Sequence, residues 1–154
     1  MGQIASFYSA YLGQIVSIIV DGETVQRVTL GPVRAAREQI AAAPVQALKN
    51  YLQGANADLT VFSVDLDGCS TFERATFECV RHLRRGSVAT YSEVAAKIDN
   101  PRAARAVGNA LSRNPVPLFI PCHRVVGASD LGGFSWGREM KSKLLQLEGV
   151  RTRA

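Results

Sequence analysis

Short apolar runs rich in β-branched side chains dominate the start of the chain, and such runs are typical of strands. Two of them, at 15–20 and 24–30, flank Asp21-Gly22, which is a strong signal for a hairpin turn. The pattern therefore predicts short strands over 4–30, two of which are joined by a tight turn.

A helical pattern follows this region. It covers 33–53, and Pro44 is expected to divide it into two pieces because proline interrupts a helix. The apolar run at 59–64 predicts one further strand. The turn at 65–68 is the expected domain boundary.

From residue 70 onward the apolar positions recur at helical spacing. Ser70-Thr71-Phe72-Glu73 is a capping box, which predicts a helix that closes at Gly86. Thr90-Tyr91-Ser92-Glu93 is a second capping box, which predicts a short helix through Ile98. A last helix is expected from about Arg138. Its apolar face consists of Met140, Leu144 and Leu147.

Between these helices the sequence predicts another helix, which starts at Asn100-Pro101 and ends near Ser112. Together with the short helix before it, it would form a helix-turn-helix. Arg102 and Arg105 lie at its beginning, and small residues make it slim. Those small residues either pack against a core or let the helix approach a nucleic-acid groove, and the arginines favour the groove. They are Ala103, Ala104, Ala106, Gly108 and Ala110.

Positive charge is concentrated in the second half of the chain. The 154 residues are 47% hydrophobic and 20% charged, which is ordinary for one or two globular domains. Residues 1–69 carry a net charge of −2 and residues 70–154 a net charge of +7, mostly from arginine. This asymmetry favours a polyanionic partner. No apolar run approaches the roughly 20 residues that span a bilayer, and we expect a cytoplasmic protein.

The three cysteines show no metal-site pattern. Cys69, Cys79 and Cys122 are scattered, and with only two histidines they give no spacing for zinc ligands. Cys69 and Cys79 could form a disulfide, but two small buried hydrophobic residues are the preferred interpretation. We expect no metal.

The segment 120–126 carries candidate chemistry, because a histidine directly follows a cysteine there. A deprotonated cysteine is a strong nucleophile, and histidine is the usual base near neutral pH. Arg124 and a protonated His123 are candidate sources of positive charge that would lower the pKa of Cys122. Neighbours in a strand point to opposite faces, so His123 reaches the sulfur only where the backbone turns or a water bridges. On these residues alone, a buried cysteine beside a solvated histidine is the simpler alternative.

In their order along the chain, these motifs resemble the O6-alkylguanine-DNA alkyltransferase family, also called methylated-DNA–protein-cysteine methyltransferases. The resemblance covers 72–150, and Pro121-Cys122-His123-Arg124-Val125 is its most specific part. It implies an α+β fold, with a small N-terminal α/β (ribonuclease H-like) domain over 1–67. A mostly helical winged helix-turn-helix domain over 68–154 would follow. The other matching motifs are Thr90–Ala95, Ala103–Gly108, Asn114–Pro117 and Leu144–Gly149.

The resemblance implies DNA repair by direct reversal. An alkyl group would move irreversibly from O6-alkylguanine, and from O4-alkylthymine, in double-stranded DNA to Cys122. His123 would take the thiol proton through a water, and Glu148 would orient the histidine. Asn114 would tie this network to the turn before the cysteine, and Tyr91 would donate a proton to the leaving guanine. The thioether product is stable, so one monomeric chain would repair one base without a cofactor.

The family also implies residues that bind the DNA and the base. The alkylated base must leave the stack, and Arg105 would fill its place from a helix lying in the minor groove. The expected DNA-binding residues are Arg105, Arg102, Ala104, Gly108 and Arg113. The expected pocket residues are Pro117, Val125, Phe134 and Ser135, with Val125 contributing a backbone oxygen.

One position departs from the family pattern. Many members carry tyrosine where Phe134 stands, so a contact to the guanine oxygen would need another donor, such as the N–H of Ser135. The departure bears on the size of alkyl group accepted. The glycine-rich loop at 131–137 is either a wing or the rim of a pocket.

Two rival functions stay open. One is a non-catalytic DNA-binding module, either an alkyltransferase-like protein that senses lesions or a winged regulator. Cys122 argues against the lesion sensor because such relatives lack this cysteine. The other is a cysteine hydrolase, which would need an oxyanion hole and would turn over repeatedly.

Overall fold

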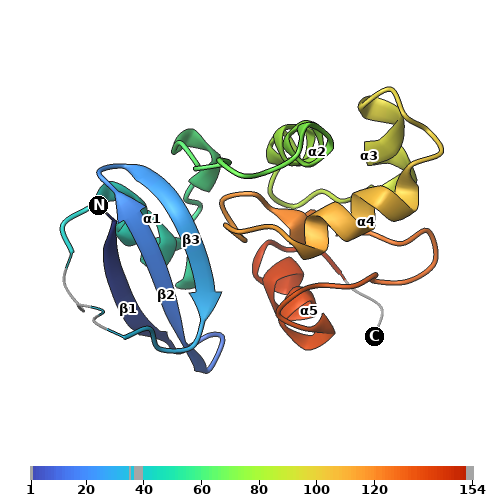
Figure 1. The fold of residues 1–154 in the computed structure, drawn as a ribbon. Helices are drawn as coiled ribbons and strands as arrows, with labels where there is room; N and C mark the ends of the chain where they lie inside the picture. The colour runs from blue at the N-terminus through green and yellow to red at the C-terminus, as the bar shows by residue number, and fades with distance from the viewer. Residues whose placement is uncertain (1, 35, 37–39, 152–154) are drawn as a thin grey trace. The chain divides into compact units, whose positions relative to one another are not determined.

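The computed structural model describes residues 2–34, 36 and 40–151, which form a mixed α/β fold (Figure 1). The chain divides into two compact units. The first is Met1–Leu66 with Pro115–Phe119, and the second is Asp67–Asn114 with Ile120–Ala154. The motifs predict one domain over 68–154, but 115–119 groups with the first unit instead. Long-range contacts cause this difference, among them the hydrogen bond from the Val28 N–H to the Pro115 carbonyl (3.1 Å).

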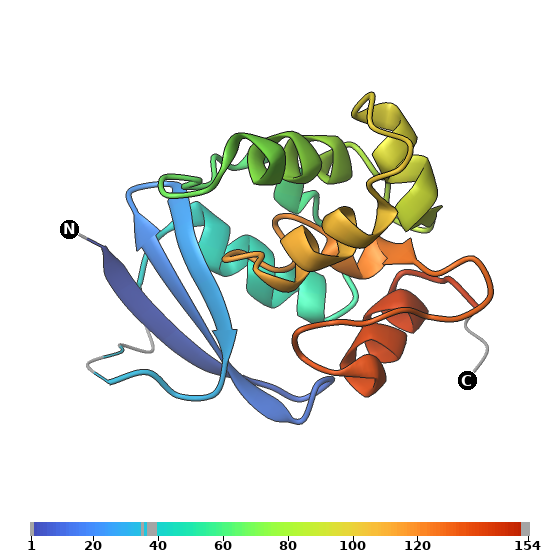
Figure 2. The same cartoon turned by 45° about the vertical axis from the view of Figure 1, so that its right-hand side comes forward.

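The first unit contains a three-stranded antiparallel sheet, shown in blue in Figure 2. Its strands β1 (Gln3–Ser9), β2 (Gln14–Asp21) and β3 (Thr24–Leu30) are paired in the order β1-β2-β3. The hairpin predicted at Asp21-Gly22 is confirmed. Gly22 has a φ of 60°, a conformation that glycine adopts at little cost in a two-residue turn.

The helix predicted over 33–53 is wrong in its first part. Helix α1 spans Ala43–Leu52, and Pro44 stands in its first turn, where the missing N–H has no helical partner to lose. The described residues of 33–42 lie outside the helix, and residues 35 and 37–39 lie outside the described part of the chain.

The strand predicted over 59–64 is also wrong. Leu59–Val61 form a single 3-10 turn, η1, because the Asp58 carboxylate accepts the Thr60 N–H (2.9 Å) and caps the turn. Val64 alone pairs with the sheet, through a bridge to Val25.

The second unit begins with helices that open as the sequence predicts. Helix α2 (Thr71–Arg81) starts at the Ser70 capping box, and helix α3 (Tyr91–Lys97) starts at the Thr90 capping box. In each box the hydroxyl accepts the N–H of a glutamate three residues later, and the glutamate returns a bond to the cap N–H. Tyr91 is therefore held in the first turn of α3.

Helix α4 (Ala104–Ser112) begins later than predicted. Asn100 and Pro101 form a separate turn that the Ala103 N–H closes on the Asn100 carbonyl (3.0 Å), and the first helical bond runs from Val107 to Ala103 (2.8 Å). Asp99 makes the preceding turn with a φ of 59°, which aspartate tolerates better than most residues. Arg102 consequently lies in the turn before the helix.

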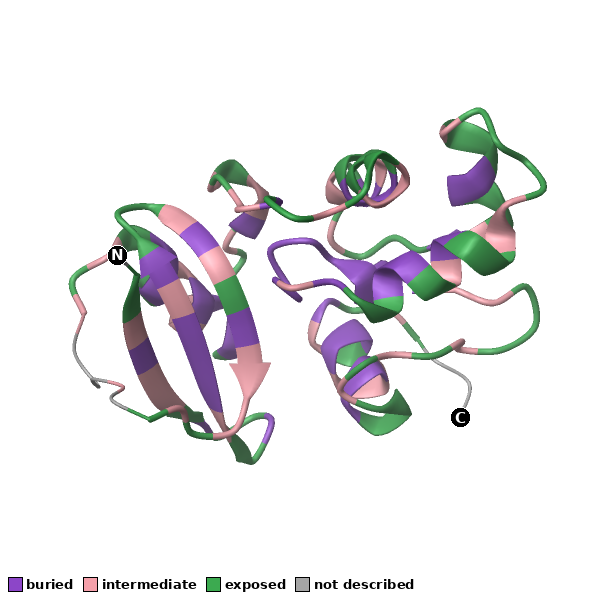
Figure 3. Cartoon of the chain, in the orientation of Figure 1, coloured by how far each residue is buried: buried purple, intermediate pink, exposed green. Residues whose placement is uncertain are grey.

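The rest of the second unit surrounds the cysteine motif. Cys122–Arg124 form a 3-10 turn, η2, followed by β5 (Val125–Val126), which pairs in parallel with β4 (Ala89–Thr90). Helix α5 (Arg138–Leu147) closes the unit and contacts η2. Figure 3 shows buried positions on α2, α4 and α5, and the core includes Phe77, Val80, Val94, Val107 and Leu144. Among the described residues, no helix is long and apolar enough to cross a membrane.

Candidate active site

A cavity of about 600 Å³ opens within the second unit, a size suited to a small organic ligand. Its walls come from the start of α3, from α4, from Cys122 and from the loop 127–137. Tyr91, Arg105, Phe134 and Ser135 are among the side chains that line it. The fold thus brings together predicted site residues that four separate motifs contribute.

Cys122 begins the η2 turn, and only 4% of its surface is exposed. Its N–H donates to the Ile120 carbonyl (2.7 Å), and Asn114 Nδ2 donates to the same oxygen (2.9 Å). Asn114 also hydrogen-bonds to the Cys122 sulfur. Asn114 therefore stabilises the turn before the cysteine and contacts the thiol itself.

The thiol of Cys122 is protonated in the resting protein. Burial raises its pKa to about 11, and the Asn114 hydrogen bond and the charge of Lys141 offset only part of that rise. The sequence motif predicts positive charge at the sulfur from His123 and Arg124. Burial lowers the pKa of His123, which keeps its ring neutral near neutral pH, and the Arg124 guanidinium is paired with Glu148. Both expected sources of charge at the sulfur are therefore wrong.

A buried polar network lies behind the cysteine. His123 Nε2 and Glu148 Oε2 are 2.8 Å apart, and both side chains are fully buried. Arg124 grips the same carboxylate with two bonds, from Nε to Oε1 (2.8 Å) and from Nη2 to Oε2 (2.9 Å). Arg124 Nη1 also donates to the Leu83 carbonyl (2.8 Å). Each of the three guanidinium nitrogens thus donates to an oxygen.

The pKa of Glu148 reflects two opposed effects. Burial alone would raise it, but hydrogen bonds from His123 and Arg124 outweigh burial and hold it well below its ordinary value. Glu148 is therefore ionised, while His123 is neutral. A neutral imidazole held by an ionised carboxylate is the pairing that general-base chemistry requires.

Tyr91, in the first turn of α3, also lines the cavity. Its hydroxyl donates a long bond to the Gly133 carbonyl (3.5 Å), and burial raises its pKa. Gly132 has a φ of 74°, and a Cβ there would lie 2.5 Å from the tyrosine oxygen. Glycine at this position lets the loop approach the ring closely. Tyr91 can thus act as a proton donor at neutral pH.

Sequence reasoning missed Lys141 of α5. Its side chain is fully buried, and its Nζ donates to the carbonyls of Val125 (2.6 Å) and Gly133 (2.9 Å). Burial lowers its pKa to about 8. The signal was present in the sequence, because position 141 precedes Leu144 and Leu145 by one helical turn. A lysine on the apolar face of a helix is unusual enough to indicate a site residue.

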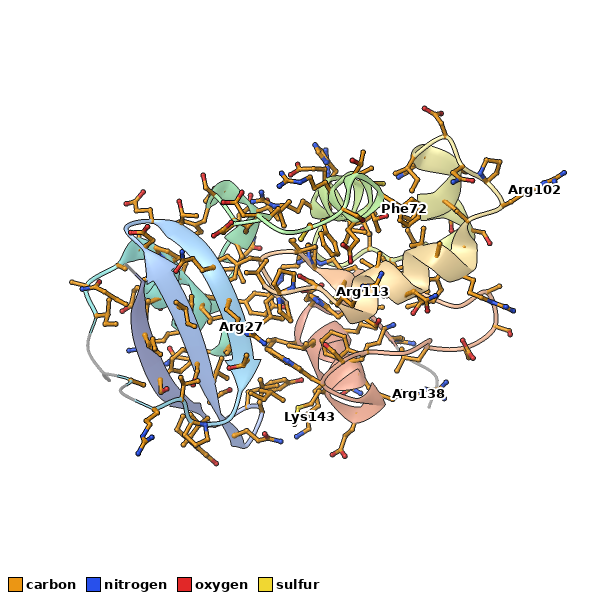
Figure 4. All side chains as sticks on the ribbon, in the orientation of Figure 1. Arg27, Phe72, Arg102, Arg113, Arg138 and Lys143 are labelled. Atoms are coloured by element: carbon orange, nitrogen blue, oxygen red, sulfur yellow. The ribbon has the colours of Figure 1, made fainter. Side chains whose placement is uncertain are left out.

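The predicted DNA-binding residues are placed differently from one another. Arg105, Ala104 and Gly108 lie on α4 and line the cavity, and Arg105 is exposed. Arg102 is exposed in the turn before α4 and projects away from the protein (Figure 4). Arg113, which caps the end of α4, has its Nε 2.8 Å from the Glu73 carboxylate of α2. The Arg113 side chain thus has an intramolecular partner. A ligand can reach the other four predicted residues, Arg102, Ala104, Arg105 and Gly108.

The predicted pocket residues also divide. Phe134 and Ser135 line the cavity, and the Phe134 ring meets the rings of His123 and Trp136 edge-on, with centroids 6.4 Å and 5.9 Å away. Val125 is fully buried, and its carbonyl accepts a hydrogen bond from the Lys141 ammonium. Pro117 is buried in the segment 115–119, which groups with the first unit.

Cys69 and Cys79 are half-buried, and no disulfide joins these two described residues. For these two residues the disulfide alternative is wrong, and so is the expectation that both are buried. Within the described ranges, no group of three or more histidine, cysteine or acidic side chains could hold a metal ion.

The second unit matches a known family. Residues 71–150 match the family model described as "6-O-methylguanine DNA methyltransferase, DNA binding domain". A methylated-DNA–protein-cysteine methyltransferase of Sulfolobus acidocaldarius is 49% identical over 105 residues, which are 68% of this chain and 65% of the relative. One from Methanothermobacter thermautotrophicus is 39% identical over 107 residues, 69% and 60% of the two chains. The chain therefore covers less than two thirds of the length of these relatives.

Other matches extend over most of the chain. A probable methylated-DNA–protein-cysteine methyltransferase of Acanthamoeba polyphaga mimivirus is 33% identical over 138 residues, which are 90% of this chain and 92% of the relative. Among solved structures, Mycobacterium tuberculosis OGT in complex with DNA superposes with a TM-score of 0.79 and 27% identity. That match covers 96% of this chain and 93% of the other.

These matches define the class of the protein as that of the methylated-DNA–protein-cysteine methyltransferases. The chain belongs to the 6-O-methylguanine DNA methyltransferase family. The resemblance stated from the sequence motifs is thereby confirmed.

Proposed function

We propose that this chain repairs DNA by moving an alkyl group from O6-alkylguanine, and from O4-alkylthymine, to Cys122. The observation that carries the proposal is the position of Cys122. The thiol of Cys122 lines a ligand-sized cavity, and the next residue, His123, forms a buried pair with Glu148. A buried thiol that served packing alone would need neither. The chain also belongs to the 6-O-methylguanine DNA methyltransferase family.

The reaction is a displacement at the alkyl carbon. The Cys122 sulfur forms a bond to that carbon while the bond from the carbon to the guanine oxygen breaks. The thiol proton passes through a bridging water to His123, whose ring Glu148 holds in place. Tyr91 donates a proton to the departing guanine. The thioether is stable, so each chain acts once and needs no cofactor.

DNA binding is assigned to the second unit. Arg105 enters the duplex from α4 and fills the place of the flipped base, while the small residues Ala104 and Gly108 let the helix approach the minor groove. Arg102 and Arg113 contact phosphates. The M. tuberculosis neighbour was solved with DNA, which supports DNA as the partner of this chain.

Finer features of the fold are part of the same proposal. We assign a ribonuclease H-like fold to the N-terminal domain and a winged helix-turn-helix to the rest, with α3 and α4 as the helix pair. We infer that the protein acts as a monomer. The cytoplasmic location expected from the sequence stays a prediction.

The experiment that tests the function is a mass measurement. The protein is incubated with a duplex that contains one O6-methylguanine and is then weighed and digested. We expect a gain of one methyl group per chain, located on Cys122, absent in Cys122→Ala and unchanged in the matched control Cys79→Ser. Duplex binding without any gain of mass would favour the lesion sensor. Repeated turnover of an ester substrate would favour the hydrolase.

The role of Arg105 has its own test. Arg105→Ala is expected to slow repair of duplex DNA far more than reaction with free O6-methylguanine base, because only the duplex requires flipping. Arg138→Ala is the matched control, since this arginine is also exposed but does not line the cavity. Equal slowing on duplex and free base would contradict the flipping role.

A further inference from the structure

Lys141 carries a buried positive charge to which the proposed reaction assigns no role. It is a fully buried lysine, and no carboxylate of the described residues forms an ion pair with it. Its hydrogen-bond partners are two neutral carbonyls, those of Val125 and Gly133. Burying a charge without an opposite charge destabilises the folded protein. An apolar side chain at this position would therefore favour folding more than the ammonium does.

The groups around the Lys141 ammonium belong to the cavity. Gly133 lines the cavity together with Cys122, and Val125 follows the η2 turn that Cys122 begins. The ammonium lies 5.8 Å from the centre of the ring of Tyr91, a residue that also lines the cavity. The two carbonyl bonds hold the ammonium between β5 and the loop that lines the cavity.

Electrostatic coupling joins Lys141 to the sulfur. The charge of Lys141 lowers the pKa of Cys122, and the charge of Cys122 raises the pKa of Lys141. Such coupling is reciprocal by necessity. The other charged groups that act on Lys141 are Asp130, which favours its ammonium form, and Arg138, which opposes it. Both flank the loop 131–137 and are exposed, so solvent screens them.

We propose that Lys141 is the counter-charge of the Cys122 thiolate, an electrostatic positioning residue that stabilises the sulfur anion as the thiol proton leaves. The proposal rests on the function proposed above. The proton still goes to His123, and near neutral pH Lys141 keeps all three of its own protons. In the resting protein the ammonium lacks an anion, and ionisation of the sulfur supplies one. The unfavourable burial of the ammonium is thereby offset in the state in which the Cys122 sulfur is an anion.

The test measures the thiol separately from repair. In a Cys69→Ser, Cys79→Ser background, the rate of Cys122 alkylation by iodoacetamide is followed against pH by peptide mass. Lys141→Gln removes the charge but keeps a donor, Lys141→Met removes both, and Lys141→Arg keeps the charge. Lys143→Gln is the matched control, since it removes a lysine from the same helix at a position that is not fully buried. Circular dichroism reports which variants fold.

Loss of an opposite charge close to a thiolate is worth roughly 1–2 pH units, so the neutral variants should react roughly ten- to a hundredfold more slowly near neutral pH. Their profiles should shift to higher pH, while the arginine and Lys143 variants stay within about threefold of the parent. A folded Lys141→Gln or Lys141→Met with an unchanged pH profile overturns the proposal. It is also withdrawn if only the arginine variant folds, because the charge would then serve the fold alone.

The two proposals fail in different ways. Absence of methyl transfer in the parent protein refutes the repair function and leaves the iodoacetamide profiles informative about Lys141. Methyl transfer in the parent, with profiles that ignore the Lys141 charge, refutes the counter-charge and leaves the repair function standing.

Discussion

Breaking the Arg124–Glu148 pair behind Cys122 from one side should be among the most destabilising single changes in the second unit. Both side chains are at most 9% exposed, and two bonds of 2.8 Å and 2.9 Å join them. Arg124→Met leaves a buried carboxylate facing a neutral histidine, and Glu148→Gln leaves a buried guanidinium without an anion. Because each change strands a charge, each should be far more costly than the loss of a hydrogen bond.

Breaking a buried ion pair from one side costs about 3–5 kcal/mol, so either single variant should lose about that much stability. The double variant, Arg124→Met with Glu148→Gln, leaves no unpaired charge of this pair. Its free energy of unfolding should therefore be about 2–3 kcal/mol higher than the sum of the two single losses predicts. Urea unfolding of the four proteins gives the cycle. The exposed pair Arg113–Glu73 is the matched control, and its cycle should give less than about 1 kcal/mol, because its arginine is 61% exposed.

Acid should remove the contribution of Glu148. Its folded pKa lies below the unfolded value, so its stabilisation is present above an unfolded pKa of about 4.3 and is lost as pH falls toward the folded pKa. Glu148→Gln should lack that acid-side loss. Additive losses in the cycle, within about 0.5 kcal/mol, would refute the reasoning, as would identical acid profiles of the parent and Glu148→Gln.

Two further predictions concern the walls of the cavity. Thr90→Ala removes the cap bond to the Glu93 N–H (3.1 Å) and should cost about 1 kcal/mol in thermal unfolding; an unchanged melting temperature would contradict the capping role. Phe134→Ala removes edge contacts to His123 and Trp136 and should cost roughly 1–3 kcal/mol in urea, since each aromatic pair contributes about 0.5–1.5 kcal/mol. The fluorescence of Trp136, the only tryptophan, should shift to the red in this variant, and an unshifted spectrum would show that Phe134 does not shield it.

Elements that a motif of a few neighbouring residues specifies formed where the sequence predicts them. Both capping boxes, at Ser70 and Thr90, and the hairpin at Gly22 formed where the pattern predicts, because each needs only its own backbone and one or two side chains. The predictions that failed needed distant partners. The run at 59–64 has strand composition, but Val64 alone finds a strand to pair with, and Asp58 caps a turn instead.

The site divides in the same way. The motifs around Cys122 were sufficient to identify the family, since a family match depends on the order of residues in the chain. The electrostatics were not predictable. Sequence neighbours suggested His123 and Arg124 as the charges near the sulfur, yet Glu148, 25 positions from His123, engages both.

The sequence by itself determined the local elements, the position of the cysteine motif and the concentration of positive charge, because short-range hydrogen bonding and composition govern these. Only the tertiary structure decided the protonation of the thiol, the neutrality of His123 and the burial of Lys141. The physical reason is that desolvation and Coulomb interactions depend on which groups lie nearby in space, and folding brings those groups together from distant parts of the chain.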